Sequence, residues 1–364
     1  AGGFVINGVA TGDNSGYSVS DAGDVNGDGL DDLIIGAHYD DPNGNGSGAS
    51  FVVFGKADGA AVELSTVEAG TGGFVINGAN AFDNSGYSVS SAGDVNGDGF
   101  DDLIIGAHYD DPNGSNSGAS FVVFGKSGGA VVELSEIELG TNGGGFVING
   151  VATGDYSGRS VSSAGDVNGD GFDDLIIGAD YDDPNGLSSG ASFVVFGKAD
   201  GAAVELSTVE AGTGGFVING VATGDYSGLP VSSAGDVNGD GLDDLIIGAF
   251  FDDPNGLSSG ASFVVFGKTD GTAVELSDIE LGTNAGGFVI NGVATGDNSG
   301  YSLSSAGDVN GDGLDDLIVG ALVDDQNGND SGASFVVFGK TDGAAVELST
   351  VEAGTGGFVI NGVA

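Results

Sequence analysis

The sequence contains no cysteine, methionine or tryptophan, and only 6 of its 364 residues are Lys or Arg. Without cysteine there is no disulfide framework and no thiolate that could bind a metal or act as a nucleophile. The 54 acidic residues give a formal net charge of −48, which repels nucleic acid and anionic membrane surfaces. No apolar run approaches the roughly 18 residues of a membrane span. These absences exclude disulfide-rich scaffolds, nucleic-acid binding and membrane insertion.

Glycine and internal repetition are what the chain has in abundance. Its 75 glycines follow no collagen-like period and therefore indicate many turns. The stretch GDVNGDGLDDLIIGA begins at Gly23, and nearly identical segments begin at Gly93, Gly165, Gly235 and Gly307. The spacings of 70, 72, 70 and 72 residues indicate one structural unit used five times.

Each repeat predicts four short strands. SGYSVSSAGD alternates in polarity, DLIIGA and GASFVVFGK are rich in β-branched and aromatic residues, and GGFVINGVA is the fourth such segment. In the polar connection VELSTVEAG, Ser65 and Glu68 have the spacing of a capping box, which predicts one helical turn. Gly36 and Ala37 end the second strand and should let neighbouring sheets approach closely.

Four short strands in each long repeat are typical of propeller blades. We therefore expect an all-β fold, a β-propeller of four-stranded antiparallel blades, forming one domain over residues 1–364. The repeats are expected at about 11–80, 81–152, 153–222, 223–294 and 295–364, with residues 1–10 as an orphan outer strand.

The orphan strand leaves alternatives open. GGFVING occurs six times, first at Gly2 and last at Gly356, whereas the other segments occur five times. Residues 1–10 either compete with the last copy for one sheet edge or complete the last blade of another copy, which would link subunits head to tail. The chain also fits a part of a longer array of blades or a polymer.

The acidic loop has the pattern D-x-N-x-D-G-x-x-D, which places oxygen donors around a tight turn. Asp24, Asn26 and Asp28 offer side-chain oxygens, Leu30 its carbonyl, and Asp32 a final carboxylate. An all-oxygen set with several carboxylates suits Ca²⁺ better than Mg²⁺. An EF-hand is rejected because its twelfth loop position needs Glu and a following helix, whereas this chain has Ile in a strand there. Asx turns without a metal are the structural alternative.

All five copies keep the full donor set, so about five Ca²⁺ ions are expected, one per repeat. The corresponding residues of the other copies are Asp94, Asn96, Asp98, Phe100, Asp102, Asp166, Asn168, Asp170, Phe172, Asp174, Asp236, Asn238, Asp240, Leu242, Asp244, Asp308, Asn310, Asp312, Leu314 and Asp316.

GDVNGDGLDDLIIGA followed by FVVFG resembles the FG-GAP repeat of integrin α-subunit propellers and their bacterial relatives, over essentially the whole chain. The resemblance implies calcium binding in the hairpin between the first two strands of each blade. Two features depart from the family pattern. Integrin-type propellers have seven blades, whereas this chain has five acidic loops, and the proline of GAP is replaced at His38, His108, Asp180, Phe250 and Leu322.

Other polar residues receive plainer interpretations. Asp31, next to the last loop ligand, and its copies either support the metal ligands through hydrogen bonds or are merely solvated, and solvation is the favoured interpretation. His38 and His108 are interpreted as local substitutions. Asp40 and Asp41 beside Pro42 are explained by turn chemistry without a second metal. The Lys that ends each FVVFGK is interpreted as a surface counter-charge.

N-x-S sequons, which are candidate glycosylation sites, occur in the turn that varies most between repeats. They begin at Asn45, Asn113 and Asn329.

We expect no enzyme activity, because the chain offers no asymmetric catalytic constellation: it has one Arg, two equivalent His and no Cys. The function we predict is a non-catalytic, calcium-binding propeller for adhesion or surface interaction, with an extracellular protein or glycan as its ligand. Millimolar calcium outside cells matches such sites, so the expected location is extracellular, secreted or cell-surface. The alternatives are a structural subunit of a fibre or surface layer, with copies of itself as partners, and an accessory domain of a secreted polysaccharide- or lipid-active enzyme.

Overall fold

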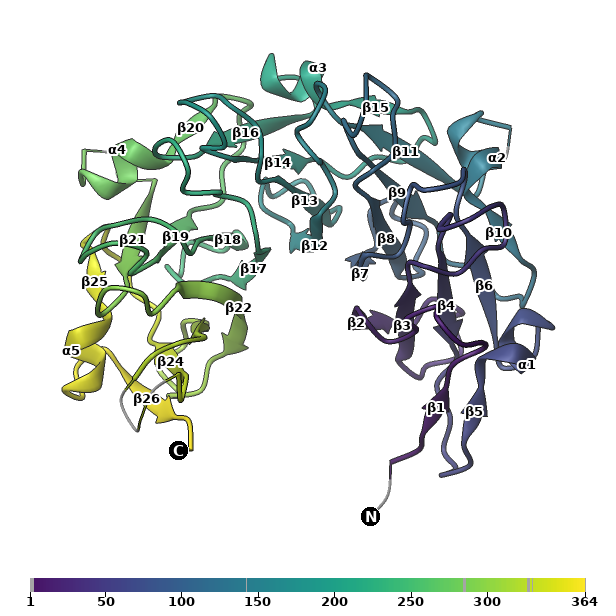
Figure 1. Ribbon diagram of the computed structural model, residues 1–364, viewed down its shortest axis with the longest axis horizontal. Coiled ribbons are helices and arrows are strands. Elements are labelled where there is room, and N and C mark those ends of the chain that lie inside the picture. The colour runs from purple at the N-terminus through teal and green to yellow at the C-terminus, as the bar shows by residue number, and fades with distance from the viewer. Residues whose placement is uncertain (1–2, 142, 284–285, 326–327, 329, 364) are drawn as a thin grey trace. The chain divides into compact units, whose positions relative to one another are not determined.

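The computed structural model describes residues 3–141, 143–283, 286–325, 328 and 330–363. Internal contacts divide the chain into two compact units: unit 1 holds residues 1–163 and 197–207, and unit 2 holds residues 164–196 and 208–364. Both units are built from the same elements, which Figure 1 colours in chain order from purple to yellow.

Each repeat begins with three strands joined as an antiparallel meander. The first strands are β2 (Val19–Gly23), β7 (Ser88–Gly93), β12 (Ser160–Gly165), β17 (Val231–Gly235) and β22 (Ser299–Gly307). The second strands are β3 (Asp32–Ala37), β8 (Asp102–Ala107), β13 (Asp174–Ala179), β18 (Asp244–Ala249) and β23 (Asp316–Ala321). The third strands are β4 (Ala49–Val53), β9 (Ala119–Val123), β14 (Ala191–Val195), β19 (Ala261–Val265) and β24 (Ala333–Val337).

A two-residue strand, a short helix and a fourth strand complete the repeat. The two-residue strands are β5 (Val62–Glu63), β10 (Val132–Glu133), β15 (Val204–Glu205), β20 (Val274–Glu275) and β25 (Val346–Glu347). The helices are α1 (Leu64–Glu68), α2 (Leu134–Glu138), α3 (Leu206–Glu210), α4 (Leu276–Glu280) and α5 (Leu348–Glu352). The fourth strands are β6 (Gly73–Asn77), β11 (Gly145–Asn149), β16 (Gly215–Asn219), β21 (Gly287–Asn291) and β26 (Gly357–Asn361), and β1 (Ile6–Asn7) is their shorter counterpart.

The strands pair into one sheet per repeat. Unit 1 holds the sheets β10-β6-β4-β3-β2 and β15-β11-β9-β8-β7, and a two-stranded sheet β1-β5. Unit 2 holds the sheets β17-β18-β19-β21-β25 and β22-β23-β24-β26, and the strands β13-β14-β16-β20 of a third sheet. The first strand of that sheet, β12, contains the chain position at which unit 1 ends and unit 2 begins. The prediction of an all-β propeller with five blades of this kind is confirmed.

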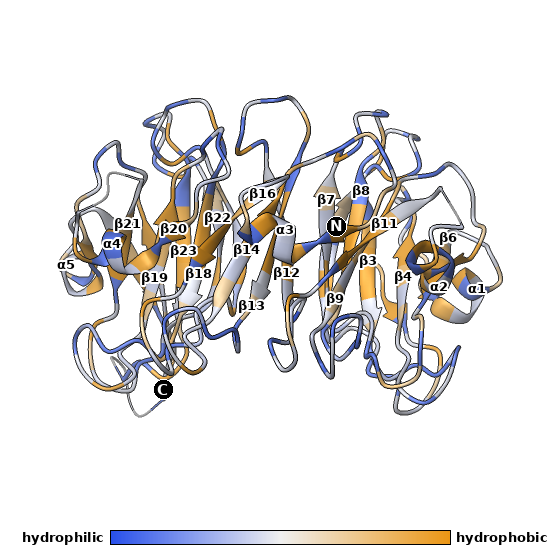
Figure 2. Ribbon diagram, turned by 90° about the horizontal axis from the view of Figure 1, so that it is seen from above, coloured by the Kyte–Doolittle hydropathy of each residue, from blue (hydrophilic) through white to orange (hydrophobic). Residues whose placement is uncertain are grey.

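The central strands are apolar on both faces because they lie inside stacked sheets. All residues of β8, β9, β13 and β14 are buried, which alternating strands with one solvated face would not allow. In unit 1, Ile34 and Phe74 of the first repeat share a core with Leu103 and Phe121 of the second. Figure 2 shows these strands in orange and the connecting loops mostly in blue or white.

The glycine that precedes the last residue of the second strand is required by the start of the next repeat in the first four repeats, but not at Gly320 in the fifth. A Cβ on Gly36 would lie 2.1 Å from the carbonyl oxygen of Gly86, and one on Gly106 would lie 1.9 Å from that of Gly158. Since both contacts are with backbone, neither can relax by a side-chain rotation. The close approach predicted at Gly36 is confirmed.

The predicted helical turn is present, but its cap is not the predicted one. α1 has Glu63 as its N-cap and no side-chain hydrogen bond there, so the capping box from Ser65 to Glu68 is wrong. The helix starts at Leu64 because Leu64 and Val67 are buried on its inner side. The hydroxyl of Thr66 donates to the carbonyl of Glu63 over 2.7 Å instead.

Each two-residue strand joins the sheet of the preceding repeat. β10 pairs in parallel with β6, with Ile76 opposite Val132, and β15, β20 and β25 pair with β11, β16 and β21 in the same way. β1 pairs with β5 in this manner too. The orphan strand therefore lies where a preceding blade would place its fourth strand, and residues 1–2 of its predicted range lie outside the described residues.

The single domain predicted for 1–364 stays a prediction.

Candidate metal centre

The predicted calcium ligands lie in the hairpins that join the first and second strands. Residues 24–31 connect β2 to β3, and Asp32 is the first residue of β3. The other four donor sets lie in the same way between β7 and β8, β12 and β13, β17 and β18, and β22 and β23. The hairpin is thus the one that the sequence resemblance implied.

The first aspartate of each loop organises its backbone. Oδ1 of Asp24 accepts the backbone N–H of Gly27 over 2.8 Å and that of Asp28 over 3.0 Å, and Oδ2 accepts that of Gly29 over 2.8 Å. The same three bonds occur at Asp94, Asp166, Asp236 and Asp308. Gly27 and Gly29 have φ of +74° and +86°, so the turn needs glycine at both.

The last aspartate joins the loop to the sheet. Asp32 is fully buried, and its Oδ1 accepts the backbone N–H of Gly55, just beyond β4, over 2.7 Å. The amide of Asn26 donates to both carboxylate oxygens over 3.2 and 3.0 Å. In the later loops Asp102, Asp244 and Asp316 repeat the bond to the third strand's end and also accept a backbone N–H from their own loop.

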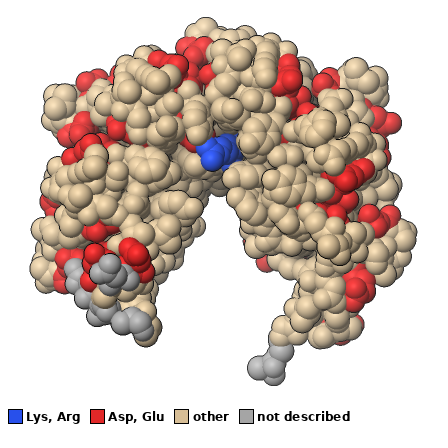
Figure 3. Space-filling view, viewed as in Figure 1, with Lys and Arg blue, Asp and Glu red and all other residues tan. Residues whose placement is uncertain are grey.

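These buried carboxyl groups are harder to ionise than ordinary ones, because the loop contains no Lys or Arg to offset a negative charge. Burial raises the pKa of Asp32 to about 6, and the nearby charges of Asp28 and Asp24 add to the effect. For the same reasons the pKa of Asp102 rises to about 8 and that of Asp244 to about 7. The ammonium groups of Lys56, Lys198, Lys268 and Lys340 pair with the aspartate two residues further along the chain. Figure 3 shows acidic side chains, in red, as separate patches on the face in view, with little blue of Lys or Arg among them.

The donor chemistry fits a hard divalent cation. Asp24, Asp28 and Asp32 would supply carboxylate oxygens, with Asn26 and the carbonyl of Leu30 as neutral donors. Within the described residues, no three Asp, Glu or His side chains are gathered closely enough to hold an ion as they lie. The carboxylates serve as hydrogen-bond acceptors for the loop, so a bound cation would have to share their oxygens.

One aspartate beside the ligands has a role that the sequence did not reveal. Oδ2 of Asp101, the copy of Asp31 in the second repeat, accepts the backbone N–H of Asp24 in the first loop over 2.7 Å. Asp243 and Asp315 do the same for Asp166 and Asp236. A Cβ on Gly23 would lie 2.2 Å from this carboxylate, and the φ of +68° there also favours glycine.

The interpretation of this position as solvated holds for the exposed Asp31 and is wrong for Asp101, Asp243 and Asp315. The signal that could have found it is the presence of the same Asp in all five copies.

The lysines that follow the third strands also do more than balance charge. Nζ of Lys126 lies 4.2 Å from the ring centre of Phe74, in the fourth strand of the preceding repeat. Lys198, Lys268 and Lys340 lie 4.4–4.6 Å from Phe146, Phe216 and Phe288. These cation–π contacts join consecutive repeats. The interpretation of the lysines as surface counter-charges was therefore incomplete.

The two histidines are core residues. His38 and His108 are each 3% exposed and pack against Tyr17 and Tyr87. Burial lowers the pKa of both imidazoles, to about 3 for His108. They are therefore neutral at physiological pH, in agreement with their interpretation as local substitutions.

The sequons differ in their surroundings. Asn45 is exposed, whereas the amide of Asn113 donates to the carbonyl of Gly150 over 2.9 Å and to Glu205 over 3.0 Å. A glycan on Asn113 would replace one amide hydrogen and so break at least one of these bonds. Asn329 lies outside the described residues. Glycosylation at these three positions stays a prediction.

Repeated sheets of this kind, each with an acidic loop in its first hairpin, define a β-propeller of repeated blades. The family model of the FG-GAP repeat matches residues 15–53, 85–123, 157–195, 231–265 and 299–337, which span the first three strands of every repeat. The chain belongs to the FG-GAP repeat family, as its sequence motifs indicated.

Curated relatives include integrin α chains. Integrin alpha pat-2 of Caenorhabditis elegans is 31% identical over 243 residues, which are 66% of this chain and 18% of the relative. Integrin alpha-PS2 of Drosophila melanogaster is 31% identical over 248 residues, 66% of this chain and 15% of the relative. The match thus spans less than a fifth of either relative. The helices of the described chain are five residues long each, too short to span a bilayer.

Proposed function

We propose that this chain is an extracellular, calcium-stabilised propeller module that serves adhesion or surface interaction and catalyses no reaction. The observation that carries the proposal is the fivefold repetition of an intact oxygen-donor loop that ends in a fully buried aspartate. Family membership supports calcium as the ion, because the FG-GAP resemblance implies calcium in this hairpin. About five ions are expected, one for each repeat.

In this proposal the loop residues hold the first two strands of a blade together. Asp24 holds the turn through three backbone bonds, and Asp32 holds it to the end of the third strand. Bound calcium would supply positive charge where the carboxylates of Asp24, Asp28 and Asp32 otherwise repel one another. Binding to the folded state alone stabilises by mass action, by about 2.7 kcal/mol per site at a hundredfold excess over Kd.

Thermal unfolding with and without calcium tests the proposal. We expect a sharp fall in Tm when millimolar calcium is replaced by excess EDTA, because five sites are lost together. Asp98→Asn removes one carboxylate from the second loop and should reduce the calcium-dependent part of the shift by about a fifth. Asp58→Asn, an exposed aspartate outside the loops, is the matched control. A Tm that is the same in calcium and EDTA would refute calcium stabilisation.

The adhesive role and the location rest on the similarity to integrin α chains. Extracellular calcium is millimolar, in the range of about 10⁻⁴–10⁻³ M at which extracellular modules bind it. We propose an extracellular protein or glycan as the ligand. The role as an accessory domain of a secreted polysaccharide- or lipid-active enzyme is the minor alternative.

A structural role in a fibre or surface layer is the second candidate, and strand β1 favours it. β1 pairs with β5 in a two-stranded sheet, so its other edge is not paired within the described residues. It could add to β24 of another copy by displacing β26, which occupies that edge of β24 in its own chain. Head-to-tail strand complementation of this kind would make copies of the chain its partners.

A further inference from the structure

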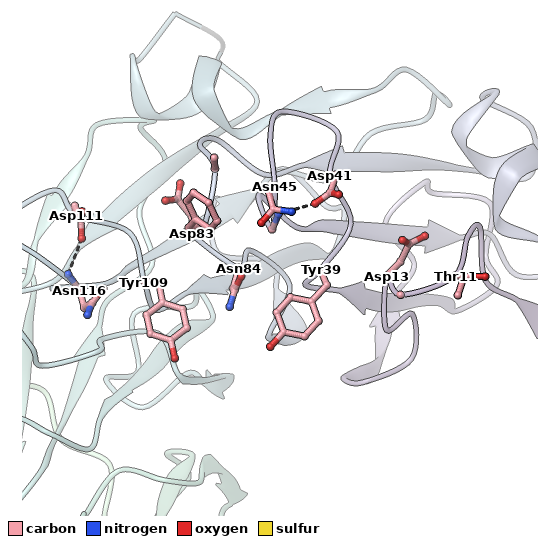
Figure 4. Close-up of a pocket in the computed structure, with 14 residues that line it drawn as sticks. Thr11, Asp13, Tyr39, Asp41, Asn45, Asp83, Asn84, Tyr109, Asp111 and Asn116 are labelled. Atoms are coloured by element: carbon pink, nitrogen blue, oxygen red, sulfur yellow. Dashed lines mark hydrogen bonds between the residues drawn. The ribbon is translucent and has the colours of Figure 1, made fainter.

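One pocket of unit 1 has features that calcium binding does not explain. It has a volume of about 670 Å³ and lies between the turn that follows β3, the loop that follows β6 and the turn that follows β8. Figure 4 shows Tyr39 and Tyr109 on either side of Asn84, with both rings pointing the same way. The acidic calcium loops are at the opposite ends of strands β3 and β8, so this is a separate place in the fold.

Phe82, which lines the pocket, breaks the pattern of the repeats. The other four copies have glycine at this position, at Gly12, Gly154, Gly224 and Gly296, with φ between +89° and +105°. Phe82 adopts φ of +74°, a left-handed conformation that bulky side chains disfavour. The ring is 66% exposed, so burial does not compensate for the strain.

The backbone does not need a phenylalanine here. The N–H of Phe82 donates to the carbonyl of Asn45 over 2.9 Å, and the glycines at the same position make the equivalent bond, such as Gly154 to Ser115 over 3.0 Å. Glycine would therefore build the same loop without strain. A strained, exposed aromatic ring at the rim of a pocket is the pattern expected of a binding residue.

The chemistry of the lining indicates the class of ligand. Phe82, Tyr39 and Tyr109 are 66%, 49% and 39% exposed, which leaves aromatic surface available for stacking. Asp41 and Asp111 are oriented by backbone N–H groups, each over 2.6 Å, which leaves oxygens free to accept further hydrogen bonds (Figure 4). The fourteen lining residues include no Lys or Arg, so an anionic ligand would be repelled.

The acids alone do not single out this pocket, because every repeat has them. The smaller pocket of unit 2, about 380 Å³, is lined by Asp225 and Asp253, the counterparts of Asp83 and Asp111, but has Gly224 in place of Phe82. The unit 2 pocket has two rings, Tyr226 and Phe251, and the unit 1 pocket differs by its third ring, Phe82, and by having two tyrosine hydroxyls instead of one. A ligand with apolar C–H faces and several O–H donors satisfies rings and carboxylates together.

We propose that this pocket binds a neutral oligosaccharide of about two or three sugar units, with Phe82, Tyr39 and Tyr109 stacking on sugar faces and Asp41 and Asp111 accepting hydroxyl hydrogen bonds. The proposal rests on the adhesive function proposed above and gives it a ligand class. The site is independent of the calcium loops, so the two proposals fail separately. Calcium stabilisation is read from Tm in EDTA, and sugar binding is read from titrations in constant calcium.

The test uses the full chain in millimolar calcium. Calorimetric titration with cellotriose, maltotriose, mannotriose and N-acetylchitotriose should give saturable binding of at least one, and trigalacturonate should not bind. Phe82→Gly should weaken the binding about tenfold or more through lost stacking, with a Tm at least as high as that of the unchanged chain because the strain is relieved. Tyr109→Ala should also weaken it. Leu257→Ser changes an exposed residue of the unit 2 pocket and is the matched control.

Three results would overturn the proposal. The first is the absence of binding for all four neutral sugars. The second is binding of equal strength in Phe82→Gly, which would place the site elsewhere. The third is binding of a lysine-rich peptide without any neutral sugar, which would make the pocket an acidic docking site for a basic protein segment.

Discussion

Asp110, in the turn after β8, is 5% exposed and lies among other acids. Burial raises its pKa to about 7, and the charges of Asp83 from the loop after β6, Glu138 from α2 and the adjacent Asp111 add to the shift. Asp252 has the same position in unit 2, a pKa raised to about 7 for the same reasons, and an Oδ2 that is buried without a hydrogen-bond partner. The carboxyl groups of Asp110 and Asp252 are therefore protonated more readily in the folded chain than an ordinary aspartate is.

The raised pKa makes stability depend on pH. The folded chain binds the Asp110 proton more tightly than the unfolded chain, so ionising this group destabilises the fold as pH rises from about 4 through 7. Asp110→Asn removes the charge and should stabilise the chain at pH 8 by up to about 4 kcal/mol, an advantage that shrinks as pH falls toward 4. Melting curves across this range, in constant calcium, measure the effect.

Two variants serve as comparisons for Asp110→Asn. Asp252→Asn should behave in the same way, and Asp278→Asn, on the exposed side of α4, should change Tm little at any pH. An Asp110→Asn variant that is less stable than the unchanged chain at pH 8 would contradict the account.

At the scale of elements, the two-residue strands are held by glutamates that bridge consecutive repeats. In unit 2, Oε1 of Glu275 accepts the amide of Asn219 over 2.7 Å, and Oε2 accepts that of Asn185 over 3.0 Å. The same Asn185 amide donates to the carbonyl of Gly220 over 2.8 Å. One carboxylate thus ties the end of β16 and the turn after β13 to strand β20.

Glu275→Ala removes both charge-assisted bonds and should cost about 2–3 kcal/mol, which melting in constant calcium would detect. Glu275→Gln keeps one acceptor oxygen and should lie between the Ala variant and the unchanged chain. If the Ala variant has the same Tm as the unchanged chain, the bridge does not contribute to stability.

The sequence predicted the strands and the loops well because their signals are local. The β-branched and aromatic composition of DLIIGA and ASFVV indicates strands. The spacing of the oxygen donors in D-x-N-x-D-G-x-x-D indicates the loop. The bridges were missed because they join residues far apart in the chain: Asp101 and Asp24 are 77 residues apart, and Glu133 and Asn77 are 56 apart. A strand of two residues such as β10 is also too short for any periodicity to mark it.

At the scale of the whole molecule, the adhesive and structural roles differ in assembly. The structural role predicts long species in millimolar calcium that fall apart in EDTA, and a chain that stays monomeric when residues 1–10 are deleted. Analytical ultracentrifugation and electron microscopy of both forms measure this. A full chain that is monomeric in calcium at all concentrations would contradict the structural role and leave the adhesive module.

The parallel pairing of each fourth strand with a segment of the next repeat has a consequence for synthesis. Asn77 on β6 meets Glu133 56 residues later, and Asn149, Asn219 and Asn291 meet their glutamates at the same distance. At roughly 5–20 residues per second, a ribosome needs several seconds to supply the missing partner. During synthesis, therefore, only the fourth strand of the most recently made repeat lacks its parallel partner. The sheets are completed in order from the first repeat to the last.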